Sequence, residues 1–251
     1  MKKKFLSAVC ISLSLMMFAS CNSTKSTEDQ GTTASVSATE EADGTVLENQ
    51  EEAEQLLLDL KGTYGKLWDV VLADEYKQFW LDNCTELVGE ENADGAFEML
   101  SYMVTGTLTG EEAVDAYKDG GMAYCCDFLQ GVSEFTFDGK EFSGVDENGN
   151  ELFRHTYHYI GMESARSLYI YESDDDNSGE FTYFFIAPDT METTWHIEFR
   201  YGSDLEALKS YDTGKYAYWL ASGISTDYTQ SDAENAINLF CTENLSEDSD
   251  Q

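Results

Sequence analysis

The segment SEFTFDGKEFSGV (133–145) indicates the fold of the C-terminal half of the chain. Phe135, Phe137 and Phe142 alternate with polar residues on either side of an Asp-Gly pair, a pattern typical of two antiparallel strands joined by a tight turn. Because alternate side chains of a strand point to the same face, the pattern predicts a β-hairpin that buries its phenylalanines.

A period of two continues through four further segments, with no helical pattern between them. These segments are ELFRHTYHYIGM (151–162), SLYIYES (167–173), GEFTYFFIAP (179–188) and TTWHIEFRYG (193–202). About six strands at such short spacing predict antiparallel neighbours that curl into a small barrel or a strongly bent sheet.

Helical spacing surrounds the predicted barrel. Apolar residues recur three and four apart between 51 and 118, and sequences typical of helix starts begin at Ser203 and Ser231. We therefore predict an α+β domain at 51–241. Its parts are N-terminal helices (51–118), an antiparallel calycin- or lipocalin-like barrel (132–202) and C-terminal helices (203–241), before an acidic tail at 242–251.

The first fifty residues have the composition of an export signal and a tether. Three lysines precede an apolar run at 5–19, which ends in small residues directly before Cys21. This pattern predicts a lipoprotein signal peptide at 1–20, lipidation of Cys21, and an extracytoplasmic protein anchored at the cell surface. Residues 21–50 are rich in Ser, Thr, Glu and Gly, and we interpret them as a flexible acidic tether.

The charge of the chain limits its partners. The chain has 49 acidic residues against 14 basic ones, a formal net charge of −35. Nucleic acid and a bare anionic membrane surface are excluded because both bind through clustered Lys and Arg. Membrane association is therefore expected through the lipid alone.

Common catalytic motifs are missing from the sequence. It contains no G-x-S-x-G, no P-loop, no G-x-G-x-x-G and no H-E-x-x-H. The acidic stretches 146–150 and 174–179 lack the glutamate that a calcium-binding loop needs at its twelfth position, so they are interpreted as solvated turns. We therefore expect a binding protein and not an enzyme.

Four cysteines follow Cys21, namely Cys84, Cys125, Cys126 and Cys241. An exported protein can form disulfides, and four cysteines allow three complete pairings. The sequence does not choose between them.

The histidines supply the candidate ligands. Thr194, His196 and Glu198 alternate along a predicted strand, so their side chains should share a face, and an imidazole with a carboxylate suits zinc. His155 and His158 are three apart and face opposite sides unless a bulge intervenes. At most one of them would then join His196 in the barrel interior.

The C-terminal half resembles the ZinT (YodA) metal-binding domain family. The resemblance is carried by YFFIAP (183–188), by TWHIEFRYGSD (194–204) with the helix start that follows it, and by the aromatic stretch YAYW (216–219). It implies a calycin-type barrel and a zinc site of three convergent histidines. Two of those positions hold Phe184 and Thr194 here, and only His196 remains.

We therefore predict a protein that binds a divalent metal ion, zinc first, as an accessory to metal uptake or buffering. His196 is the expected anchoring ligand, completed by Glu198 with His158 or His155. A component of a metal-uptake transporter is an expected partner. The alternative is a barrel that has lost its metal and holds a small apolar or glycan ligand, or a protein partner.

Overall fold

The structure, a computed structural model, describes residues 47–246. Its α-helices are α1 (Gln50–Asp59), α2 (Leu67–Val71), α3 (Lys77–Val88), α4 (Ala93–Val104), α5 (Gly110–Tyr117), α6 (Leu205–Leu208) and α7 (Gln230–Leu245). Its strands are β1 (Gly62–Lys66), β2 (Glu134–Asp138), β3 (Glu141–Val145), β4 (Glu151–Glu163), β5 (Leu168–Ser173), β6 (Tyr183–Ile186), β7 (Ile197–Gly202) and β8 (Ala221–Ser225). Short 3-10 turns, η1 (Asp74–Tyr76) and η2 (Gly179–Phe181), complete it. The predicted signal peptide, Cys21 and most of the predicted tether lie outside the described residues.

The eight strands form a closed antiparallel barrel in chain order, which confirms the predicted α+β barrel class. Closure comes from β1 pairing with β8, with Gly65 opposite Ile224. Both strands lie in segments predicted as helical, 51–118 and 203–241. The prediction differed there because each strand is short, contains glycine and gains its hydrogen bonds only from a partner far away in the sequence.

The hairpin predicted at 133–145 is present. β2 pairs with β3, with Phe137 opposite Phe142. The turn at 146–150 is held by Asp146, whose Oδ1 accepts the backbone N–H groups of Asn148 at 2.8 Å and Asn150 at 2.9 Å. The strand order from β2 to β7 therefore follows from short connections along the chain, whereas β1 and β8 pair with each other across the sequence.

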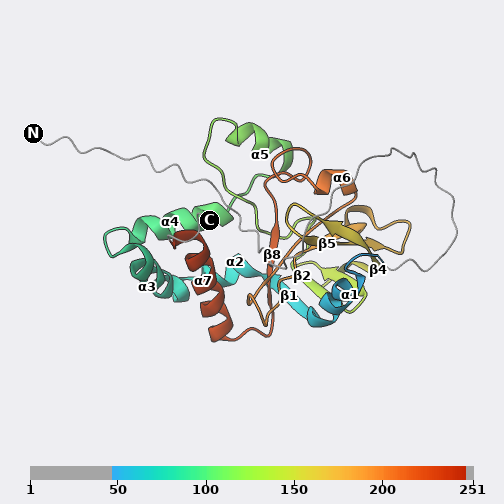
Figure 1. Ribbon diagram of the computed structural model, residues 1–251, viewed down its shortest axis with the longest axis horizontal. Coiled ribbons are helices and arrows are strands. Elements are labelled where there is room, and N and C mark those ends of the chain that lie inside the picture. Colours follow the sequence, from blue (N-terminus) through green and yellow to red (C-terminus); the bar gives the residue numbers. More distant parts are fainter. Residues whose placement is uncertain (1–46, 247–251) are drawn as a thin grey trace, which may run out of the picture.

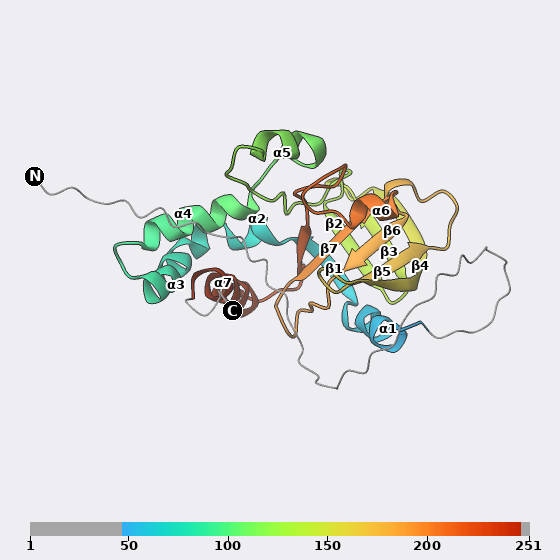
Figure 2. The same cartoon turned by 45° about the horizontal axis from the view of Figure 1, so that its top comes forward.

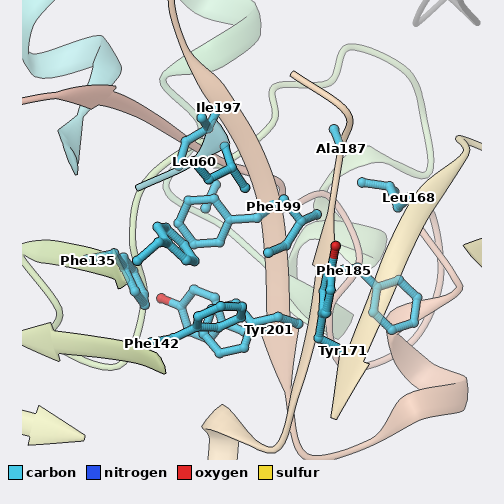
Figure 3. Packing of buried hydrophobic residues seen from close by; sticks show 14 of the residues in the cluster. Leu60, Phe135, Phe142, Leu168, Tyr171, Phe185, Ala187, Ile197, Phe199 and Tyr201 are labelled. Atoms are coloured by element: carbon cyan, nitrogen blue, oxygen red, sulfur yellow. The ribbon is translucent and has the colours of Figure 1, made fainter. Parts of the chain in front are cut away.

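Aromatic rings fill the barrel interior (Figure 3). Phe142 stacks on Tyr157 with ring centroids 4.3 Å apart, and Phe135 meets Phe199 at 5.0 Å. Phe184, at one of the two positions where the resemblance implied a zinc histidine, is fully buried among these rings. An interior packed at these distances holds its own side chains and leaves no room for a bound ligand.

α1 closes one end of the barrel. Leu56, Leu57 and Leu60 belong to the same buried cluster as the barrel rings, and the Tyr171 hydroxyl donates to the Ala53 carbonyl at 2.7 Å. The helix therefore seals the barrel core at that end.

The helices α3, α4 and α7 form a second core beside the barrel (Figures 1 and 2). Trp80 is its largest buried side chain, and its indole N–H donates to the Val71 carbonyl at 2.7 Å. α2 and β8 join the two cores, because Leu67 and Ile224 pack in the helical cluster.

Helix boundaries near the C-terminus differ from the prediction. α6 has Asp204 as its N-cap, with its side chain accepting from the Glu206 and Ala207 N–H groups. α7 starts with a capping box between Thr229 and Asp232, two residues earlier than predicted, and it continues to Leu245. The first residues of the predicted tail at 242–251 are therefore helical. Among residues 47–246, no helix is long and apolar enough to cross a membrane.

Candidate metal site

The strand β7 separates an apolar face from a polar one. Ile197 and Phe199 point into the barrel and are fully buried in its core. The residues that alternate with them, His196, Glu198 and Arg200, therefore lie on the outer face. His196 and Glu198 lie on the same side of the strand, as predicted. However, that side points outward toward the helices and not into the barrel interior.

The chain enters β7 through a turn that orients His196. Trp195 has a left-handed backbone (φ 61°) and packs against the helical core. Thr194 lies in this turn, where its hydroxyl contacts the Thr190 and His196 carbonyls, so it does not share the strand face as predicted. The turn explains why the alternation begins at His196 and not at Thr194, two residues later than the sequence suggested.

His196 has one nitrogen fixed and one available. Its Nδ1 lies 2.7 Å from the Thr194 carbonyl oxygen, and since a carbonyl only accepts, Nδ1 is the donor. In the neutral ring Nε2 then carries the free lone pair, and it lies 3.9 Å from Oε1 of Glu198. A carbonyl that fixes the tautomer in this way is the usual support of a metal-binding imidazole.

Three carboxylates act on this imidazole. Partial removal from water raises the pKa of Glu198 to about 7, a rise that the His196 ring opposes and Asp189 increases. Burial is also the main cause that raises the pKa of Asp189 and that of Glu243, and His196 opposes both shifts. These three carboxyl groups therefore lose their protons less readily than carboxyl groups in water.

Two further polar groups near Glu198 lack good partners. Ser222 stands opposite Glu198 in the β7–β8 register, and its hydroxyl is buried, as is the indole N–H of Trp68. Both interact with the Cys126 thiol, a weak hydrogen-bonding group, and neither has a hydrogen-bond partner of normal geometry. No local pattern predicts these contacts, because each residue comes from a different element.

His155 and His158 lie at the other end of the barrel. Adjacent strands place His158 opposite Glu172, Glu172 opposite Tyr183 and Tyr183 opposite Gly202. Gly202 is six residues along the chain from His196, which corresponds to about 20 Å at the rise of a β-strand. The structure therefore does not bring His158 to His196, and His155 lies three residues further still in that direction.

Each of these two histidines has an acidic partner of its own. His155 Nδ1 lies 2.8 Å from an Asp175 carboxylate oxygen, and His158 Nδ1 lies 2.7 Å from one of Asp174. His155 faces inward with its side chain 17% exposed, whereas His158 is 49% exposed. They face opposite sides, as predicted, and the acidic turn at 174–179 uses two of its carboxylates to hold them.

Within residues 47–246, no three His, Cys, Asp or Glu side chains are placed closely enough to hold a metal ion as they stand. The residues that the structure brings together are His196 and Glu198, with Asp189 and Glu243 acting on them electrostatically. Asp189 directly follows the I-A-P sequence, and Glu243 lies in the predicted tail, so neither was a sequence candidate.

Comparison with known proteins gives a distant structural likeness. No family model matches the chain, and no curated protein matches it. The chain is similar to the Zn(II)-bound ZinT-like domain of Streptococcus pneumoniae AdcA, with 13% identity and a TM-score of 0.45 over 74% of this chain and 89% of that one. It is also similar to Zn(II)-bound AdcA from the same organism, with 12% identity and a TM-score of 0.43 over 73% of this chain and 35% of that one. At these scores the likeness carries no functional argument.

Proposed function

We propose that this protein binds a divalent metal ion of the zinc type through His196 and Glu198, outside the cytoplasm. One observation carries the proposal. The His196 ring, whose Nδ1 donates to a carbonyl, lies beside Glu198, and Glu198 has no other ion-pair partner among the described residues. Zinc takes nitrogen and oxygen ligands, and its positive charge would replace the proton that Glu198 holds near neutral pH.

The distance between the two ligand atoms suits a shared ion after a small movement. A zinc ion bound at about 2.0–2.2 Å to each, with a tetrahedral angle, separates its ligands by about 3.4 Å. The observed separation of Nε2 and Oε1 is 3.9 Å, which a modest side-chain rotation closes. Asp189 and Glu243 are the proposed further ligands, and a water molecule would fill any remaining position.

The proposed setting follows from the leader sequence. A lipid on Cys21 would hold the protein at the membrane, and residues 22–50 would set the folded domain off the surface. In this position the protein would buffer metal or deliver it to an uptake transporter. Binding and release, without chemical conversion, is the activity proposed.

The experiment is a zinc titration of the full-length protein and its single-residue variants by calorimetry. We expect a dissociation constant below about 0.1 mM for the unsubstituted protein and an affinity that falls as the pH drops below about 7, because Glu198 and the imidazole must both be deprotonated. His158→Ala and His155→Ala are the matched controls, since each removes one imidazole at the opposite end of the barrel. Complete loss of zinc binding in either control would show that the zinc site lies at the opposite end of the barrel.

The alternative predicted from the sequence is a barrel that holds a small apolar or glycan ligand. The filled interior opposes it, because Phe135, Phe142 and Phe184 occupy the space that such a ligand would need. A protein partner bound on the outer surface remains the competing function. It predicts that zinc does not bind at His196.

A further inference from the structure

The interface between α3 and α7 brings together two cysteines that are far apart in the sequence. Asn83 and Asn238 fix the register of the two helices, because the Asn238 side-chain amide donates to Asn83 Oδ1 at 2.7 Å. Cys84 follows Asn83, and Cys241 lies three residues, about one helical turn, after Asn238. The same register therefore sets the two thiols against each other.

Both thiols are enclosed in this interface. Cys84 and Cys241 are each 0% exposed, both belong to the helical core, and their side chains interact directly with each other. Trp80 and Phe240 flank them, with ring centroids 6.1 Å apart. Neither thiol is used by the proposed metal site.

The two remaining cysteines of the described residues lie elsewhere. Cys125 and Cys126 are adjacent, and their backbone carbonyls accept from Leu220 and Ser222, beside and within β8. Cys126 contacts Trp68 and Ser222 at the metal-site side of the barrel. Of the three complete pairings that the sequence left open, each includes a bridge from Cys125 or Cys126. All four cysteines are free thiols in the structure, and Cys84 and Cys241 are the two that lie against each other across separate helices.

We propose that Cys84 and Cys241 form a disulfide that ties α3 to α7 when the protein matures outside the cytoplasm. Each thiol loses one hydrogen and one sulfur–sulfur bond forms, so two electrons and two protons leave the protein. A disulfide-bearing oxidant accepts them by thiol–disulfide exchange: one thiolate attacks it to give a mixed disulfide, and the second thiolate displaces the reduced carrier.

Oxidation takes place in the folding chain, before the interface closes. Both thiols are fully buried in the folded protein, so an oxidant cannot reach them once the helices have packed. For the same reason the finished bridge is shielded from reductants. It joins residues on α3 and α7 that are far apart in the sequence, and closing so long a loop restricts the unfolded chain strongly.

The bridge also bears on the metal site. Glu243 lies two residues beyond Cys241 on α7 and acts electrostatically on His196. A bridge at Cys241 fixes the last turns of α7 and with them the position of this carboxylate. The bridge itself does not depend on metal binding, so its test stands apart from the zinc titration.

The test is a non-reducing peptide map of the full-length protein after refolding with oxidised glutathione. Free thiols are alkylated in denaturant before digestion. We expect one crosslinked species that joins the Cys84 and Cys241 peptides, lighter than their sum by two hydrogen atoms, with Cys125 and Cys126 alkylated. Alkylation of all four cysteines, or a crosslink that includes Cys125 or Cys126, would overturn the proposal.

A second measurement compares thermal stability with and without reductant present during unfolding. The unsubstituted oxidised protein should melt roughly 5 to 15 °C higher than its reduced form. The double variant Cys84→Ala/Cys241→Ala should lose this difference, whereas the matched double variant Cys125→Ala/Cys126→Ala should keep it. A difference that persists in the first variant would contradict the proposed pairing.

Discussion

The two faces of β7 differ in how completely their side chains are satisfied. On the inner face, Phe199 packs against rings from β2, from β6 and from the segment before β2, and its environment is complete. On the outer face, Glu198 has a raised pKa, one imidazole 3.9 Å away, and a neighbouring hydroxyl without a good partner. The inner face therefore stabilises the fold, and the outer face retains the unsatisfied polar groups that a ligand could complete.

Arg200, on the same outer face, has more hydrogen-bond partners than Glu198, although its buried Nε has none. Its fully buried guanidinium donates to the carbonyls of Leu208 at 2.7 Å, Ser210 at 3.0 Å and Tyr216, and it lies over the Tyr211 ring at 4.2 Å. This residue holds the segment between α6 and β8 against the barrel.

The largest effect is expected on the inner face. Phe199→Ala removes a ring that is 0% exposed, and the cost of the lost burial and of the cavity should be about 3–5 kcal/mol in the free energy of unfolding. Chemical denaturation followed by fluorescence measures it. Phe199→Leu, which keeps most of the volume, should cost less and leave zinc affinity unchanged. Equal losses in both variants would contradict the packed interior.

Removing the His196 imidazole on the outer face should lower the affinity for zinc and leave the stability of the fold largely unchanged. His196→Ala should weaken zinc binding by about 100-fold or more, close to 2.7 kcal/mol, because the neutral nitrogen ligand is lost. Calorimetry with zinc gives the affinity, and a thermal melt of the metal-free variant gives the stability. A variant that fails to bind only because it unfolds would show this in the melt.

The carboxylate on the same face should make stability depend on pH. The folded state holds the Glu198 proton up to about pH 7, whereas the unfolded chain releases it near its ordinary value of 4.5. The folded state therefore binds more protons in this window, and stability falls as the pH rises from 4.5 to 7. Glu198→Gln should remove this loss and melt about 2–4 °C higher than the unsubstituted protein at pH 8, with no gain at pH 4. A lower melting temperature at pH 8 would contradict the raised pKa.

The smallest effect is expected at the opposite end of the barrel. Asp174→Asn breaks the ion pair between Asp174 and His158. The side chain of each residue is 49% exposed. Exposed pairs contribute about 0–1 kcal/mol, so stability should change within that range and zinc affinity should not change. Denaturation of this variant beside the unsubstituted protein measures the difference. A loss of several kcal/mol would show that the 174–179 turn matters more than its exposure suggests.

Local sequence signals predicted most of the barrel. Alternation around Phe135 and Phe142 depends only on neighbouring residues, and the structure confirms this hairpin. β1 and β8 escaped prediction because each is defined by its pairing with the other, across most of the domain. Closure of the barrel is therefore a property of long-range pairing that a local pattern does not contain.

The candidate site was predicted in part for a similar reason. The spacing of His196 and Glu198 was enough to place both on one face. It could not show which face is buried in the barrel, nor that His158 lies at the other end, because both depend on the strand order and register. Asp189 and Glu243 reach the site from separate segments, so only the folded chain shows them together.

The central claim is that His196 and Glu198, on the outer face of β7, bind a divalent metal ion. Its most direct test is the zinc titration of the unsubstituted protein beside His196→Ala and His158→Ala, all at pH 7.5. The account predicts a dissociation constant below about 0.1 mM that His196→Ala weakens by about 100-fold or more and His158→Ala leaves unchanged. No binding tighter than about 0.1 mM in the unsubstituted protein, or equal loss in the two variants, would contradict it.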